Sequence, residues 1–193
     1  PAFPFRLRVI EALNGQLLTQ TYYTTPLIRE GKVLANPDAD ILKIVVVNRY
    51  RKAAVAKGFI KNVGLKQGAF ASSVAHDSHN LIAVGADDKS IQEALAALIP
   101  HGGGLSFSLH GNTDVLPLPV AGLMSLQSGE EVAEAYTRIH QAVIHAGSTL
   151  AAPYMTLSFM ALLVIPALKL SDLGLFDGED FSFTSWADPI EVS

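Results

Sequence analysis

Short apolar runs separated by turn residues dominate the first part of the chain. Residues 5–13 alternate apolar and polar positions, Asn14-Gly15 follows, and residues 16–23 are rich in β-forming side chains. Asn-Gly between two such runs is typical of a β-hairpin. Residues 41–47, ILKIVVV, are short, apolar and β-branched, which favours a buried strand. We therefore expect the chain to begin with β-sheet.

The next segments place a polar cluster between two strands. The stretch NRYRKAAVAKGF, residues 48–59, fits either a helical turn or a loop, because its periodicity favours neither. Residues 69–75 and 81–85 are two further strand candidates. Between them lies HDSHN, residues 76–80, a connection too short for a parallel crossover. The pattern predicts that these five residues form the tip of a hairpin.

A helix and two more extended segments follow. Asp87 or Asp88 can cap the helix, and Pro100 stops it. LSFSLHG, residues 105–111, alternates like a strand, whereas residues 114–124 contain two prolines and suit an edge segment or an extended loop. The apolar stripe expected on the helix consists of Ile91, Ala94, Leu95 and Leu98.

The last third of the chain holds a second helix and a long apolar run. Ser128 and Glu131 form a capping-box pattern, and Gly147 marks the end of that helix. The run Met155–Ile165 is 11 residues long, well short of the roughly 20 that cross a bilayer. It predicts a buried strand or core segment, and FSFTSW, residues 181–186, predicts a last short strand.

These elements predict a single domain covering residues 1–193. An N-terminal hairpin and loop occupy residues 1–40, and the main body occupies residues 41–193. About seven or eight strands and two helices are expected, and several strand pairs are joined by turns too short for a parallel crossover. The predicted class is α+β, with a mainly antiparallel sheet and helices packed against it.

The composition restricts the partners and the site chemistry that we expect of this protein. Charged residues make up 17% of the chain, the net charge is −4, and there is no long basic cluster, which argues against nucleic acid as a partner. No segment suits a membrane. The absence of cysteine excludes disulfides and thiolate metal sites and fits a cytoplasmic protein. The chain begins with Pro1 and lacks a signal-peptide pattern, which we interpret as processing or as a fragment of a longer protein.

The densest chemistry lies at His76, Asp77, Ser78, His79 and Asn80. Two histidines three residues apart can share a metal on a tight turn but face opposite sides of a strand. A His-Asp-Ser run is not by itself a catalytic triad, because triad partners meet through the fold. Aspartate and serine also form turns with their own backbone. These five residues therefore fit two interpretations, a site for substrate or metal and a purely structural turn.

Other candidate groups are weaker. His101 precedes Gly102-Gly103-Gly104, but a phosphate loop needs a strand before it and a helix after it, the reverse of the order here. Three cationic residues beside a strand end usually form a solvated surface. They are Arg49, Arg51 and Lys52.

Three segments carry a family resemblance: GFIKNVGLKQGAFASSVAHDSHNLIAVGADD, LPLPVAGLMS and YMTLSFMALLVIPALKLSDLGLFD. Together they make the chain, from about Ile41 to Phe183, resemble the C-terminal domain of bacterial adenine deaminases of the amidohydrolase superfamily. The chain departs from the family at Tyr50-Arg51-Lys52 and at Leu163. The resemblance implies a parent enzyme that hydrolyses adenine to hypoxanthine and ammonia with metal-activated water.

The resemblance also implies what lies outside this chain. The divalent metal, of the Mn, Fe or Zn type, would belong to an upstream (β/α)₈ barrel, and no metal or other cofactor is expected here. The tip, residues 76–80, would complete or close the active site, and the fragment alone would be inactive. Two alternatives stand beside this interpretation. One is a packing or homo-oligomerisation domain, and the other is a self-contained metallohydrolase using His76 and His79 with Asp77 or His101.

Overall fold

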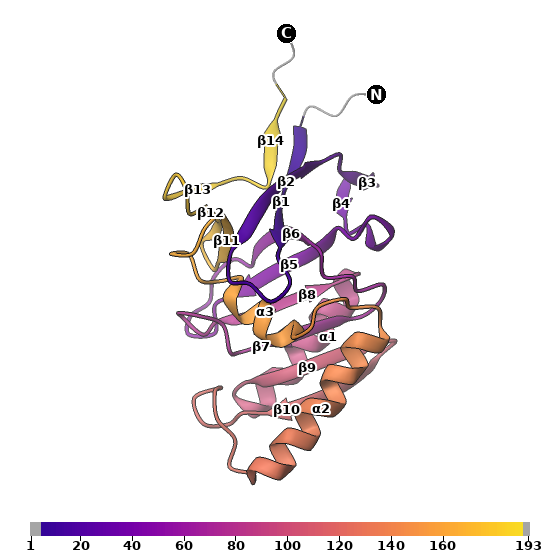
Figure 1. The fold of residues 1–193 in the computed structure, drawn as a ribbon, viewed down its shortest axis with the longest axis vertical. Coiled ribbons are helices and arrows are strands. Elements are labelled where there is room, and N and C mark those ends of the chain that lie inside the picture. The colour runs from indigo at the N-terminus through magenta and orange to yellow at the C-terminus, as the bar shows by residue number, and fades with distance from the viewer. Residues whose placement is uncertain (1–4, 191–193) are drawn as a thin grey trace.

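The computed structural model describes residues 5–190, so Pro1, on which the inference of processing rests, lies outside it (Figure 1). A nine-stranded sheet has the order β10-β9-β7-β8-β5-β6-β1-β14, and β2 also pairs with β1. Its paired strands are antiparallel except β1 and β6. The strands are β1 (Phe5–Ala12), β2 (Thr19–Thr24), β5 (Leu42–Val47), β6 (Ala56–Lys61), β7 (Ala69–Ser72), β8 (Leu81–Gly85), β9 (Gly104–Leu109), β10 (Asn112–Pro117) and β14 (Ala187–Pro189).

Helices cover both faces of this sheet. Side chains alternate along β5, so Ile44 packs in the cluster that contains Ile139 of α2 (Gly129–His145) and Leu157 of α3 (Pro153–Phe159). Val45 points the other way, into a cluster with Ile91 of α1 (Asp88–Leu98). In Figure 1, α2 and α3 lie in front of the sheet. The predicted α+β class is confirmed.

Shorter elements complete the described residues. A three-stranded sheet follows α3, a two-stranded hairpin follows β2, and two 3₁₀ turns join other elements. None of the helices within residues 5–190 is long and apolar enough to cross a membrane. The additional elements are β3 (Leu27–Arg29), β4 (Lys32–Leu34), η1 (Pro37–Ala39), η2 (Ile99–His101), β11 (Leu168–Ser171), β12 (Gly174–Asp177) and β13 (Ser182–Thr184).

Most local signals gave the correct elements. The Asn-Gly hairpin is β1–β2, and the proline-containing segment contributes the edge strand β10. Asp87 caps α1 by accepting the Ser90 N–H at 2.8 Å. At α2 both bonds of the capping box form between Ser128 and Glu131.

Three expectations were wrong in whole or in part. Met155–Ile165 is not a strand: the first part lies in α3, which begins at Pro153, and the rest forms turns. The alternative prediction of a core segment is confirmed, because Leu157 and Met160 are buried. Residues 48–55 form a loop, one of the two expected forms, but residues 56–61 form the strand β6. Pairing with β5 supplies backbone hydrogen bonds that no local periodicity signals. The strand count was also too low, since the structure has fourteen strands within the described residues.

Candidate functional site

The polar cluster forms the tip of the β7–β8 hairpin, as predicted. Ser72 lies opposite Ile82 in the β7–β8 register, and the intervening loop contains the cluster. Asp77 and Ser78 are exposed. The His76 N–H donates to the Ser158 carbonyl at 2.9 Å, so α3 anchors the tip. The loop is therefore held in one place by a helix that lies about eighty residues further along the chain.

The two imidazoles lie side by side and are half-buried. The His76 ring stacks on Phe159 with centroids 4.8 Å apart, and it meets the His79 ring edge-on at 5.4 Å. The Ala75 N–H donates to Nδ1 of His79 at 3.3 Å, which assigns the proton of the neutral ring to Nε2. His79 is thus positioned to donate from Nε2.

Burial lowers the pKa of His79 below 6.5, and electrostatic interaction with the neighbouring His76 and Arg49 lowers it further. The carboxylate of Asp77 acts in the opposite direction but does not reverse the shift. The imidazole of His79 is consequently neutral at pH 7. The tip therefore offers one neutral donor and one exposed carboxylate close together.

Ser78 and Asn80 serve mainly to hold the tip together. The Asn80 side chain is 2% exposed; its Nδ2 donates to Ser78 Oγ at 3.1 Å and its Oδ1 accepts the Arg49 N–H at 3.2 Å. The Tyr50 hydroxyl donates to the Ser78 carbonyl at 2.8 Å. These bonds join the tip to the loop after β5. His76, Asp77 and His79 are left as the tip side chains available to a ligand.

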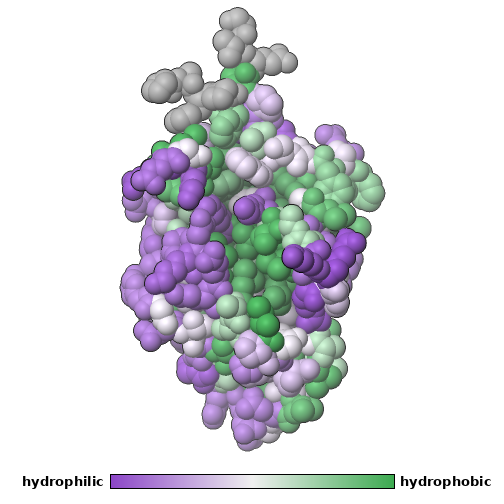
Figure 2. All heavy atoms as spheres, turned by 180° about the vertical axis from the view of Figure 1, so that it is seen from behind, coloured by the Kyte–Doolittle hydropathy of each residue, from purple (hydrophilic) through white to green (hydrophobic). Residues whose placement is uncertain are grey.

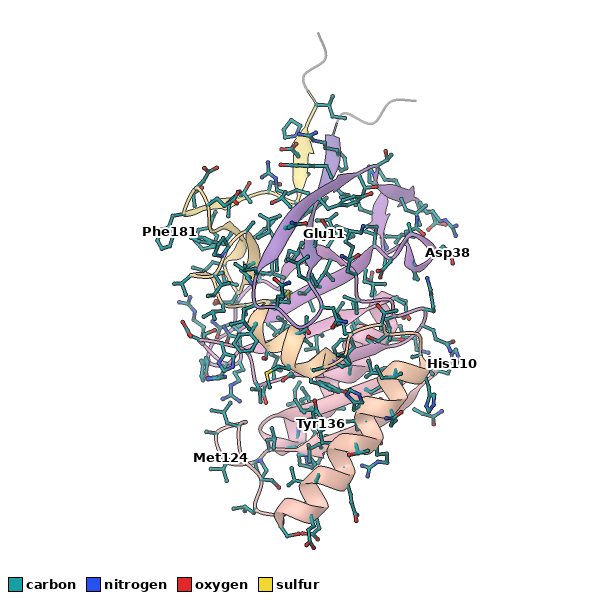
Figure 3. The ribbon with its side chains drawn as sticks, viewed as in Figure 1. Glu11, Asp38, His110, Met124, Tyr136 and Phe181 are labelled. Carbon is teal, nitrogen blue, oxygen red and sulfur yellow. The ribbon has the colours of Figure 1, made fainter. Side chains whose placement is uncertain are left out.

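An apolar cavity of 430 Å³ adjoins the tip at Asp77 and Ser78. Large side chains around it are exposed, with Phe181 at 70% and Leu173 at 67%. Figure 3 shows Phe181 on one edge of the molecule and Asp38 and His110 on the opposite edge. Contiguous exposed apolar side chains mark interaction surfaces in proteins. The tip therefore lies on an edge suited to contact with another domain.

Two further histidines lie at opposite ends of β9. His110 lies at the β9–β10 turn, at the far end of β9 from the tip, whereas His101 precedes β9 at the near end. Within residues 5–190, no group of three or more histidines, aspartates and glutamates is arranged to hold a metal ion. The chain's described part therefore supplies no ligand set for the metal that the resemblance implies.

Sequence reasoning interpreted Arg49 as part of a solvated surface and missed Phe159 altogether. Arg49 Nη1 donates to the Gly102 carbonyl at 3.2 Å and Nη2 donates to the Ala121 carbonyl, so one guanidinium joins three loops. Phe159 sits in the run misread as a strand, and only its helical position brings its ring to His76. No signal within either segment identifies these contacts, since both partners come from distant parts of the chain.

The fold and the site define an α+β domain whose polar tip has no metal-ligand set in the described residues and adjoins an exposed apolar cavity. Comparison with known families identifies the particular family to which this α+β domain is similar. The family model for the adenine deaminase C-terminal domain matches residues 16–182. The chain belongs to this family.

Individual relatives agree with the family assignment. An adenine deaminase of Methanosarcina acetivorans is 50% identical over 178 residues, which is 92% of this chain and 32% of that protein. An adenine deaminase of Salinibacter ruber is 51% identical over 185 residues, covering 95% of this chain and 34% of that protein. One from Parabacteroides distasonis is 44% identical over 180 residues. The chain spans about a third of the length of these relatives.

Proposed function

We propose that this domain belongs to an enzyme that hydrolyses adenine to hypoxanthine and ammonia, and that its β7–β8 tip forms one wall of the active site. The relatives named adenine deaminase and the family match support the reaction. The apolar edge around the tip supports contact with an upstream barrel domain. In this proposal the domain closes the site, acts in the cytoplasm and is inactive alone.

The observation that carries the proposal is the pairing of a neutral His79 donor with the exposed carboxylate of Asp77. Adenine presents an acceptor, N7, beside the donor N6–H₂ group on one edge. A donor and an acceptor at the tip complement that edge. His79 and Asp77 would orient the base, and the His76 ring, fixed against Phe159, would exclude water beside it.

The metal of the proposed reaction is assigned to the upstream domain. The described residues of this chain lack a suitable ligand set, so we assign them no step that involves the metal. The role of this chain is limited to binding and orienting the substrate and to covering the site. A self-contained metallohydrolase built on His76 and His79 gains no support from this geometry, because two imidazoles with one exposed carboxylate do not make a ligand group within the described residues.

The test uses the full-length enzyme. His79→Ala and His76→Ala are compared with wild type by kcat/KM for adenine and by bound metal, with His110→Ala on the opposite edge as the matched control. We expect the tip variants to lose about tenfold or more in kcat/KM, ~1.4 kcal/mol of transition-state stabilisation, with metal content unchanged. Wild-type kcat/KM in both tip variants would leave a packing or oligomerisation role as the better description.

A further inference from the structure

The face of the sheet that carries α1 is hollowed along the side of that helix. Two adjoining cavities, of 450 and 490 Å³, lie between α1 and the segment that links β5 to β6, and both are lined by Val47. One contacts α1 at Ile91 and Leu95, and the other contacts Leu98 and Ile99. Figure 2, seen from behind, shows an apolar band between two hydrophilic flanks. We call these two cavities together the α1 groove.

The floor of the α1 groove is apolar and incompletely covered. Val45 and Leu81 line it from the sheet and are buried. At its margins Val55 is 42% exposed and Ile99 is 70% exposed. Removing such side chains from water stabilises a complex by roughly 25 cal/mol per Å² of buried apolar area. The groove is thus suited to an apolar face of another segment.

Unpaired positive charge borders the groove. Lys43 forms an ion pair with Asp88 at 2.6 Å, which neutralises both groups. Arg49 and Lys57 also line the groove, and Arg51 and Lys52 are exposed in the adjoining loop. Within residues 5–190 these last four cations form no ion pair. The partner that fits such a border is acidic.

We propose that the α1 groove binds an acidic amphipathic helix from the upstream part of the parent enzyme. The two cavities meet α1 at Ile91 and Leu98, seven residues apart, which is ~10 Å along the helix axis at 1.5 Å per residue. A docked helix places apolar side chains at i and i+7 with the same spacing. Acidic side chains on the flank of that helix would pair with the exposed Lys52 and Lys57.

The docked helix is better supplied by the upstream part of the same polypeptide than by a second copy of the chain. This chain spans 32% of the Methanosarcina acetivorans relative, so two thirds of such a protein are joined to it covalently. Covalent linkage raises the effective concentration of a partner segment to about the millimolar range. The groove also adjoins the tip through the Tyr50–Ser78 hydrogen bond at 2.8 Å. This inference rests on the proposed function, because the domain that receives the tip would also supply the helix.

Zero-length crosslinking of the full-length enzyme tests the proposal. A carbodiimide joins lysine amines to carboxylates that are already in contact, and mass spectrometry locates the products. We expect Lys52 and Lys57 to be joined to upstream aspartates or glutamates several-fold more often than Lys32, an exposed lysine on β4. Mixing isotopically labelled and unlabelled enzyme separates bonds within one chain from bonds between copies.

Three results would overturn the proposal. The first is that Lys52 and Lys57 crosslink mainly between labelled and unlabelled copies. The second is that they crosslink to upstream carboxylates no more often than Lys32 does. The third is that neither lysine crosslinks to the upstream part of the chain at all. As a second measurement, Val55→Asp should increase hydrogen exchange along α1 in the full-length enzyme, whereas Lys32→Glu should not. Crosslinking reports contact and not turnover, so these outcomes are independent of whether the His76 and His79 variants lose activity.

Discussion

The ring of His76 stacks on the ring of Phe159, with centroids 4.8 Å apart and planes inclined by 28°. The same contact between the tip and the helix includes the hydrogen bond from the His76 N–H to the Ser158 carbonyl at 2.9 Å. Together these contacts fix the exposed tip of a hairpin to a helix whose other residues are largely buried. The position of the tip is therefore set by α3 as much as by β7 and β8.

Replacing Phe159 with Ala should release the tip without removing any group that would touch substrate. We expect the full-length enzyme to lose activity while the protein loses about 1 kcal/mol of stability from the missing stack. The position of the His76 ring provides a readout beyond activity: its NMR signals should lose the ring-current shift from Phe159. Phe159→Tyr, which keeps the ring, should behave like wild type. Unaltered His76 signals in Phe159→Ala would contradict this role.

The stability of the protein should fall in mild acid because of His79. Its pKa in the folded state lies below 6.5, so the unfolded chain binds the proton more strongly. The free energy of unfolding is therefore highest above pH 6.5 and decreases as the pH falls through the lowered pKa. Protonation also removes the acceptor that Nδ1 offers to the Ala75 N–H. Urea unfolding between pH 5 and 8 should show a smaller decrease in His79→Gln than in wild type. An equal decrease in the two proteins would show that another group is responsible.

Lys169 is fully buried in β11, and its ammonium donates to the Leu17 carbonyl at 2.5 Å. Burial lowers its pKa from 10.5 to about 8. The pKa difference of 2.5, 10.5 minus 8, means that folding destabilises the charged form of Lys169 relative to the neutral form by ~3 kcal/mol. The free energy of unfolding should therefore increase as the pH rises from 8 towards 10.5, because the unfolded chain retains the proton over that interval.

Lys169→Met should remove this pH dependence and raise the stability at pH 7 by up to about 3 kcal/mol. Thermal or chemical unfolding at pH 7 and pH 10 measures both effects. Lys66→Met is the control, since Lys66 is exposed and also donates to a backbone carbonyl. Lower stability of Lys169→Met at pH 7 would mean that the hydrogen bond to Leu17 outweighs the cost of burying the charge.

Gly122→Ala should disturb the junction that Arg49 makes between three loops. Gly122 has φ +76, and a Cβ built there would overlap Nη1 of Arg49. Gly15→Ala is a matched control, because Gly15 has φ +72 and nothing lies within 4 Å of its Cβ position. We expect the control to lose about 1 kcal/mol from backbone strain alone. The Gly122 variant should lose roughly 3 kcal/mol, measured by chemical unfolding. Equal losses would show that Arg49 moves away at little cost.

Local patterns were enough to place much of the fold and the tip. The Asn14-Gly15 turn, the Asp87 cap and the Ser128–Glu131 capping box each depend on residues a few positions apart, so the sequence contains their whole cause. The same is true of the HDSHN tip between its two strands. The Met155–Ile165 run was misread because a short apolar segment has the same composition in a strand and in a buried helix.

By itself, then, the sequence determined the α+β class, the capped helices α1 and α2, the hairpin tip and the family that the comparisons confirm. The tertiary structure alone decided that β1 lies between β6 and β14, that Phe159 supports His76, and that Arg49 joins the loop of Gly122 to the tip. It also revealed the α1 groove. The physical reason is the sequence separation between the contacting residues. Caps and turns are stabilised by neighbours along the chain, whereas these other contacts join residues that only the packing of the whole domain brings together.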